Sequence, residues 1–162
     1  MLRSMTVPHD DGQDTPNADA ITRIVDAAFA CHEAGELDQA EALYRKALAG
    51  DPEHAEALHL LGLIAFQSGQ FQSSMELIER ALSELDDLPE AHLNLGNVLR
   101  EVGRMAEAVS CYRRAIALNP DCGMAHSNLA RTLDDQGLFE AGLESSRRAV
   151  ELIAHTSTTP LP

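Results

Sequence analysis

Residues 89–122 read PEAHLNLGNVLREVGRMAEAVSCYRRAIALNPDC, and this stretch decides the fold. Glycines recur at an interval of 34 residues through and around it, at Gly35, Gly69, Gly103 and Gly137. One glycine marks a turn, whereas four glycines in phase indicate that one small unit is repeated four times. We number each unit so that this glycine is position 15, and the units then begin at residues 21, 55, 89 and 123.

Other positions of the unit recur in the same phase. In the quoted stretch, the pattern is carried at positions 7–8, 20, 24 and 32 by Leu95-Gly96, Ala108, Tyr112 and Pro120. Small residues at positions 8, 20 and 27 let two helices approach closely, and large residues at 4, 7, 11 and 24 fill the space between them. Repeat four departs most, because Gly142 and Ser146 replace the alanine and the aromatic residue.

Over residues 21–154 this pattern resembles the tetratricopeptide repeat family, whose unit is a helix–turn–helix of the same period. The resemblance implies an all-α fold, a right-handed superhelical array of four such units (an α-solenoid). We expect a domain at residues 20–154 made of repeats at 21–54, 55–88, 89–122 and 123–154. The alternative is an unrelated helical bundle with chance periodicity.

The two ends lie outside the repeats. Residues 1–19 are acidic and contain turn-forming Pro8, Gly12 and Pro16, so we expect a disordered leader, or else a segment that lies in the groove as a self-ligand. Residues 155–162 are expected to form a disordered tail. Repeat arrays usually end with a polar capping helix, and none is predicted here. The uncovered C-terminal helix indicates a homo-oligomer, a covering partner or a longer parent chain.

Charge and composition narrow the class of partner. The formal net charge is −14 at pH 7, which argues against unspecific nucleic-acid binding and against a polybasic membrane contact. It fits a solvated acidic surface or a preference for a basic partner. Cys31, Cys111 and Cys122 match neither a disulfide framework nor a zinc site. With no apolar span and no secretory signal in the sequence, we expect a cytoplasmic protein without membrane insertion.

The same resemblance predicts the binding surface. In the family, the first helix of each repeat lines the concave face, so positions 2, 5, 6, 9, 12 and 13 point into a groove. The N-terminal half of this groove is then apolar with one histidine, and its candidate partner-binding residues are Phe29, His59, Leu63 and Phe66. The C-terminal half is polar, with Asn94, Asn97, Arg100, Asn128 and Arg131. Amides can pair with any peptide backbone and guanidinium groups with carboxylates, although such residues are also ordinary on helix surfaces.

Two segments sharpen the resemblance. Asn94-Leu95-Gly96-Asn97 and Ala125-His126-Ser127-Asn128-Leu129-Ala130 look like the repeats of O-GlcNAc transferase-type glycosyltransferases. In those proteins a ladder of asparagines holds substrate peptides. Asp26 and Leu60 stand at the matching position of repeats one and two, so any ladder here is short, and nothing in the chain resembles the transferase domain.

The sequence indicates neither a catalytic site nor a metal site. His92 and His126 both stand at position 4, but one repeat apart (~10 Å) is too far for one zinc ion, so we expect packing histidines and no metal or cofactor. No nucleophile or phosphate motif is present in the sequence. We therefore predict a non-enzymatic module that binds a peptide segment of a partner protein. The alternatives are the substrate-docking part of a larger O-GlcNAc transferase-like glycosyltransferase, and a self-assembling scaffold joined through uncapped repeat ends.

Overall fold

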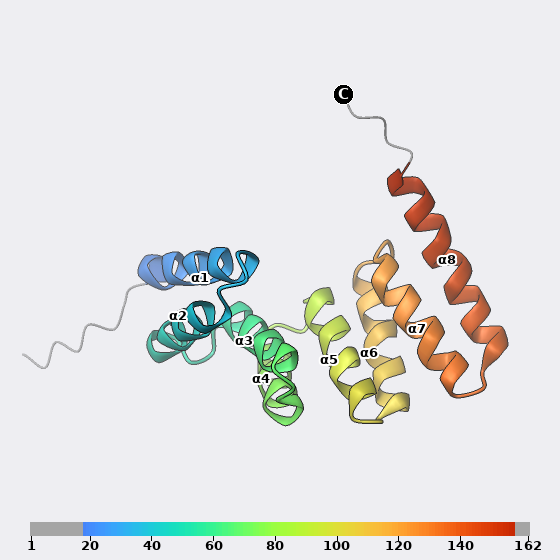
Figure 1. The fold of residues 1–162 in the computed structure, drawn as a ribbon, viewed down its shortest axis with the longest axis horizontal. Coiled ribbons are helices and arrows are strands. Elements are labelled where there is room, and N and C mark those ends of the chain that lie inside the picture. The colour runs from blue at the N-terminus through green and yellow to red at the C-terminus, as the bar shows by residue number, and fades with distance from the viewer. Residues whose placement is uncertain (1–17, 158–162) are drawn as a thin grey trace, which may run out of the picture.

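The computed structural model of this chain describes residues 18–157, and within them every regular element is an α-helix (Figure 1). The helices are α1 (Ala18–Glu33), α2 (Leu37–Gly50), α3 (Ala55–Gln67), α4 (Phe71–Glu84), α5 (Pro89–Glu101), α6 (Met105–Leu118), α7 (Gly123–Asp135) and α8 (Phe139–Ser157). The predicted all-α solenoid is confirmed. We call α1, α3, α5 and α7 the A helices, and α2, α4, α6 and α8 the B helices.

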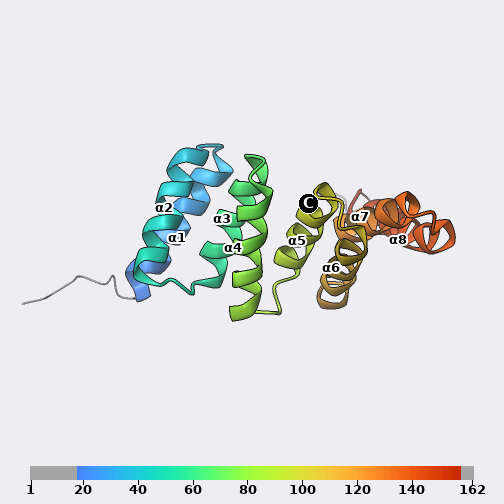
Figure 2. The ribbon, with the colours of Figure 1, turned by 90° about the horizontal axis from the view of Figure 1, so that it is seen from below.

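Each A helix packs against the B helix that follows it, and each of the first three B helices also contacts the next A helix. Figures 1 and 2 show the four pairs side by side in chain order, with their direction turning along the array. Neighbouring A helices touch as well, α3 with α5 and α5 with α7. The A helices therefore form the closely spaced inner side of the array.

The turn inside each repeat requires its glycine. All four position-15 glycines have a positive φ, between 73° and 80°, a conformation that is strained for other residues. The next residue donates its backbone N–H back to the carbonyl of position 11, as from Arg104 to Leu99 at 2.8 Å. This six-residue closure is a Schellman motif, which satisfies an orphan carbonyl at the end of the A helix.

Positions 8 and 24 set the distance between the two helices of a repeat. A Cβ atom built on Gly96 would lie 2.6 Å from Cε1 of Tyr112, closer than real contacts allow. Tyr112 is completely buried, and a glycine at position 8 lets its ring lie directly on the α5 backbone. Repeat one has Ala28 and Tyr44 at the same two positions, and both are completely buried.

The connections between repeats are held by arginines that the sequence analysis did not single out. Arg80, Arg114 and Arg148 stand at position 26 of successive B helices, and each reaches back to the loop that precedes its own repeat. Arg80 donates to the backbone carbonyl of Pro52 at 3.0 Å, whereas the other two bind the carboxylates of Asp86 and Asp121. Their spacing of 34 residues was the signal that could have identified them.

Histidines at position 4 bind the same loops. His92 Nε2 lies 2.9 Å from the backbone oxygen of Asp86, and His126 Nε2 lies 3.0 Å from that of Pro120. His92 is buried, as expected for a packing histidine. Each histidine therefore binds the loop that precedes its own repeat, and the two loops are equivalent.

The helical part is longer at both ends than the sequence predicted. α1 begins at Ala18, so the last two residues of the expected leader are helical. α8 continues to Ser157, so residues 155–157 belong to this helix and the expected end of repeat four at residue 154 was too early. The remaining leader, 1–17, and the remaining tail, 158–162, lie outside the described residues.

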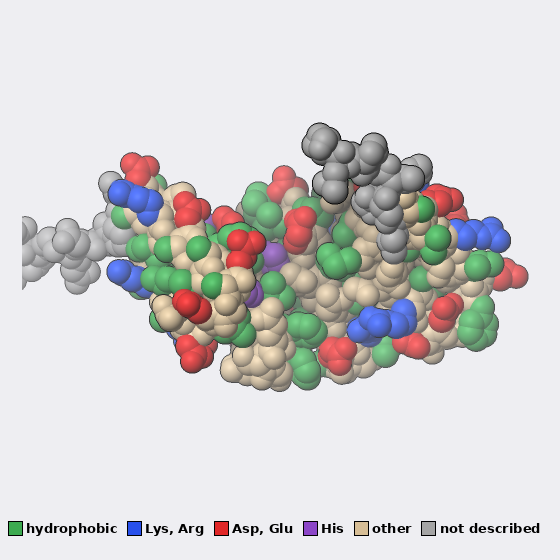
Figure 3. All heavy atoms as spheres, turned by 45° about the horizontal axis from the view of Figure 1, so that its top comes forward, with side chains coloured by type: hydrophobic (Ala, Val, Ile, Leu, Met, Phe, Trp, Pro, Cys, Tyr) green, Lys and Arg blue, Asp and Glu red, His purple; other side chains and the backbone are tan. Residues whose placement is uncertain are grey.

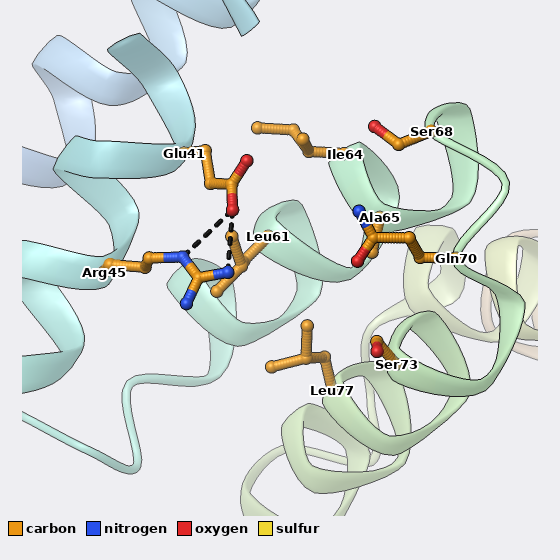
Figure 4. Close-up of a pocket in the computed structure, with 9 residues that line it drawn as sticks. All are labelled: Glu41, Arg45, Leu61, Ile64, Ala65, Ser68, Gln70, Ser73 and Leu77. Atoms are coloured by element: carbon orange, nitrogen blue, oxygen red, sulfur yellow. Dashed lines mark hydrogen bonds and ion pairs between the residues drawn. The ribbon is translucent and has the colours of Figure 1, made fainter. Parts of the chain in front are cut away.

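The contact between repeats one and two contains a small pocket lined by α2, α3 and α4 (Figure 4). Glu41 stands there at position 21, where the next two repeats have the buried Met75 and Val109. Its carboxylate accepts two hydrogen bonds from Arg45, at 3.0 and 2.7 Å. The charged groups of this pocket thus satisfy each other.

Candidate functional site: the concave face

The concave face is the side of the array on which the A helices adjoin. Figure 3 shows histidine side chains recessed between acidic ones near the middle of the molecule, on the side brought forward in that view. Most predicted groove residues are at least partly accessible: Phe29 and Arg131 are exposed, and five others are half-buried, namely Leu63, Phe66, Asn94, Asn97 and Asn128. Arg100 is also only partly buried.

His59 is the exception, and its prediction as an exposed groove residue was wrong. Its side chain is only 7% exposed, and Val25 and Leu93 at the same position 5 are also buried. Leu60, which stands at the predicted groove position 6 of repeat two, is buried too. The reason is that an A helix contacts its own B helix, the preceding B helix and a neighbouring A helix. Its buried surface is therefore wider than the single stripe that the sequence analysis assumed.

His59 nevertheless shapes the groove through Asn94, because Asn94 Nδ2 lies 2.9 Å from His59 Nε2. Burial lowers the pKa of His59, and the nearby Glu90 carboxylate opposes this shift only in part. A neutral ring can accept at Nε2, so Asn94 donates there. The Asn94 Oδ1 atom remains free to accept a hydrogen bond in the groove.

A second network joins the two C-terminal repeats. Tyr112 donates its hydroxyl to Oδ1 of Asn97 at 3.0 Å, and Asn128 Nδ2 donates to the same oxygen at 2.8 Å. Arg131 Nη2 in turn donates to Oδ1 of Asn128 at 3.2 Å. Burial raises the pKa of Tyr112 to about 12, so its hydroxyl keeps the proton that it donates.

Arg131 fixes the direction of every bond in this network. A guanidinium group can only donate, so the Asn128 atom that faces it must be the oxygen. The Asn128 amide nitrogen then points to Asn97, and the Asn97 atom that receives it must also be an oxygen. Both lone pairs of that oxygen are used, and none of the hydrogen bonds among the described residues involves Asn97 Nδ2. Asn97 therefore presents two N–H donors in a fixed orientation.

Arg100 follows Asn97 by three residues, on the same side of α5. Its Nη2 atom lies 3.3 Å from Glu101 Oε1, whereas its Nη1 atom is buried without a partner in the described structure. Its side chain is 18% exposed. An unpaired guanidinium nitrogen is a costly arrangement unless another acceptor reaches it. Arg100 Nη1 is thus an unsatisfied donor below the surface, unlike Asn97 Nδ2, which is not among the buried atoms.

The N-terminal half of the groove has a different character. Phe29 is 44% exposed, and Leu63 and Phe66 are half-buried. Phe66 packs against Phe71, with ring centroids 5.8 Å apart. This anchoring against a B helix leaves Phe66 only partly available. The apolar surface here is therefore formed mainly by Phe29 and Leu63.

Tyr44, at position 24 of repeat one, lies in the core cluster shared by α1, α2 and α3. It is fully buried, yet its hydroxyl has no hydrogen-bond partner in the described structure, and neither has the buried Nδ1 of His32 beside it. The two rings are in edge contact, with centroids 6.5 Å apart. Burial and then the Glu56 carboxylate raise the Tyr44 pKa to about 12.

The part of the chain that the structure describes contains no cluster of metal-ligating side chains, and its cysteines are unpaired. No group of three metal-ligating side chains occurs there. Cys31, Cys111 and Cys122 are free thiols, and burial raises the pKa of Cys111 to about 11, so that it stays protonated. No helix between residues 18 and 157 is long and apolar enough to cross a membrane.

Comparison with known families identifies the repeats. Two family models, both described as tetratricopeptide repeat, match residues 32–97 and 89–122. No curated protein sequence matches the chain.

Solved structures share the fold. The crystal structure of MamA superimposes with a TM-score of 0.78 at 19% identity, covering 88% of this chain and 84% of that one. A further MamA structure (MSR-1, C2) gives a TM-score of 0.69 at 23% identity, covering 87% and 82%. The O-GlcNAc transferase of Thermobaculum terrenum (K341M mutant) gives 0.70 at 29% identity, covering 80% of this chain but 23% of that one.

Proposed function

We propose, from the premise that this chain belongs to the tetratricopeptide repeat family, that its concave face holds an extended peptide segment of a partner protein. The observation that carries the proposal is the fixed orientation of Asn97. Its amide oxygen is used inside the protein, so its N–H donors face outward for a ligand. A preformed donor binds without the entropy cost of ordering a mobile side chain.

The polar half of the groove suits a peptide backbone. Asn97 Nδ2 offers donors to carbonyl or carboxylate oxygens, and Asn94 Oδ1 offers an acceptor to an N–H group. Donors and an acceptor on one helix face match the alternating groups of an extended chain. Recognition through the backbone requires no particular partner sequence at this end.

The apolar half supplies the anchor. Phe29 and Leu63 form a surface for one aliphatic or aromatic side chain of the partner, with Phe66 at its edge. The acidic Glu56 and Glu90 border this half and disfavour a nucleic acid as ligand. We propose binding without catalysis, and we place it in the cytoplasm because three free thiols are typical of a reducing compartment.

The test uses Asn97→Asp. An aspartate at residue 97 still accepts from Tyr112 and Asn128 but replaces the free donors with a carboxylate oxygen. Peptides selected from a phage-displayed random library on the full chain should bind the variant at least about tenfold more weakly, because a donor becomes a repelling acceptor. Calorimetric titration of the selected peptides measures this change.

Arg113→Ala is the matched control, since Arg113 is exposed on α6, outside the groove positions of the A helices. It should leave affinity unchanged. Equal affinity of wild type and Asn97→Asp for every selected peptide would overturn the groove proposal, provided that the variant keeps its thermal unfolding midpoint.

A second candidate function is substrate docking for a glycosyltransferase. It is favoured by the 29% identity to the O-GlcNAc transferase of Thermobaculum terrenum, of which this chain covers 23%. Asn94 and Asn128 fall at the asparagine positions of such repeats. A transferase partner, supplied in the same or another polypeptide, would then act on peptides that the groove holds. Co-purification with a glycosyltransferase from the native cell tests this candidate.

A third candidate is self-association through the end of the array. The side chains that favour it are the exposed apolar residues of α8, which include Phe139, Leu143 and Val150. Sedimentation of the full chain over a range of concentrations tests whether copies associate at all.

A further inference from the structure

The outer face of α8 carries apolar side chains that interior repeats bury. Met75 and Val109, at position 21, are 7% and 6% exposed and belong to a core cluster that includes the following A helices. Leu143, at position 21 of α8, is 52% exposed. Phe139 and Val150, at positions 17 and 28, are 67% and 66% exposed. This face is thus built like an internal packing surface.

Among the described helices, α8 packs against α7, whereas each earlier B helix contacts two A helices. Figure 1 shows α8 as the last rod of the array, and Figure 3 shows hydrophobic side chains at that end of the molecule. Exposed apolar surface of this kind usually marks an interaction site.

The spacing of the face suits a second helix. Phe139, Leu143 and Val150 follow one another at intervals of four and seven residues, as in the seam of paired helices, and the half-buried Ser146 lies at the edge of this face. Glu140 and Arg147 flank this seam on one side, seven residues apart and both exposed. Neither belongs to an ion pair within residues 18–157, whereas Arg148 next to them binds both Asp121 and Glu151.

An antiparallel copy of α8 complements these features. When Phe139 faces Val150 of the second copy, Leu143 comes beside the edge residue Ser146, so large residues meet smaller ones. The same register brings Glu140 beside Arg147 of the second copy. Two-fold symmetry repeats this ion pair, so the seam is flanked by two opposite-charge contacts. The face is therefore complementary to itself in charge and in size.

We propose that two copies of this chain pair through their α8 helices in this antiparallel register. The proposal rests on the self-association suggested above and adds its geometry. An interface of this type is closed, so it yields a dimer, whereas stacking of α8 on α1 of the next copy would continue into longer oligomers. A seam made of one helix from each copy is a small interface, so the dimer forms reversibly.

The test is a charge exchange followed by analytical ultracentrifugation of the full chain. Glu140→Arg and Arg147→Glu each place like charges opposite one another, so each variant alone should dimerise at least about tenfold more weakly. An equimolar mixture of the two variants restores both ion pairs and should form a mixed dimer with wild-type affinity. Glu53→Arg, in the exposed loop before α3, controls for the change in net charge.

The outcomes separate the two levels of the proposal. A monomeric wild type at every concentration would overturn self-association together with this geometry. Dimers that form in the wild type but are not recovered in the variant mixture would overturn the antiparallel register while leaving self-association standing. Oligomers larger than the dimer would overturn the antiparallel pairing in favour of stacking of α8 on α1 of the next copy.

Discussion

Tyr44 and Tyr112 occupy the same position of repeats one and three, and both are completely buried. The hydroxyl of Tyr112 donates to Asn97, whereas that of Tyr44 has no partner among the described residues. The difference comes from position 9, where repeat one has Phe29 in place of the asparagine. Repeat position thus determines burial, but the neighbouring groove residue determines whether a buried polar atom is satisfied. One residue couples the core to the binding face.

The largest effect is expected when position 8 of repeat three receives the alanine that repeat one has there. Gly96→Ala would place a Cβ atom 2.6 Å from the Tyr112 ring, so the ring must move and its bond to Asn97 is strained. We expect a loss of about 2 kcal/mol in the free energy of unfolding, as for other overpacked sites. Urea denaturation measures it.

Gly123→Ala is the control for this substitution, because the nearest atom to a Cβ at residue 123 is Leu152 Cβ at 3.9 Å. It should leave stability nearly unchanged. If Gly96→Ala is equally neutral, the packing distance between α5 and α6 is not limited by this glycine.

The two tyrosines should respond to the same substitution with opposite signs. Tyr112→Phe removes a made hydrogen bond and should cost about 1 kcal/mol, whereas Tyr44→Phe removes an unsatisfied hydroxyl and should stabilise by up to ~1 kcal/mol. Thermal unfolding of both variants under one buffer condition checks the signs. Destabilisation by Tyr44→Phe would indicate that its hydroxyl finds a partner in solution.

The smallest expected effect is a pH dependence of folding stability that comes from the buried His59. Burial depresses the pKa of His59 below 6.5 in the folded chain, so the unfolded chain binds more protons as pH falls. The stability associated with neutral His59 is therefore complete above pH 6.5 and is lost on acidification through its folded pKa. His59→Leu should flatten the pH dependence of stability just below pH 6.5, as urea unfolding at several pH values would reveal. An identical pH profile in the variant would contradict this prediction.

The fold was predictable from the sequence because its determinants are local. Each position-15 glycine supplies a turn conformation, and small and large residues at positions 8 and 24 fix how two helices meet. These constraints act within one repeat; the glycine recurs in all four repeats and the large residue at position 24 in the first three, so the phase could be read without coordinates.

The site was less predictable because it depends on contacts between repeats. His59 is buried since an A helix has neighbours on several sides, which a single-helix periodicity does not reveal. The direction of Asn97 depends on Arg131, a residue from the next repeat, acting through Asn128. Residue types at groove positions therefore indicated a polar surface, but not which of its atoms remain unused.

We expect the arginines at position 26 to affect the curvature of the array more than its stability against unfolding. Exposed ion pairs such as Arg114 with Asp86 and Arg148 with Asp121 contribute little to the free energy of unfolding. Each joins the B helix of one repeat to the loop arriving from the repeat before, so we expect these contacts to influence how successive repeats are oriented. Ionic strength should accordingly tune the curvature of the array while the repeats themselves stay folded.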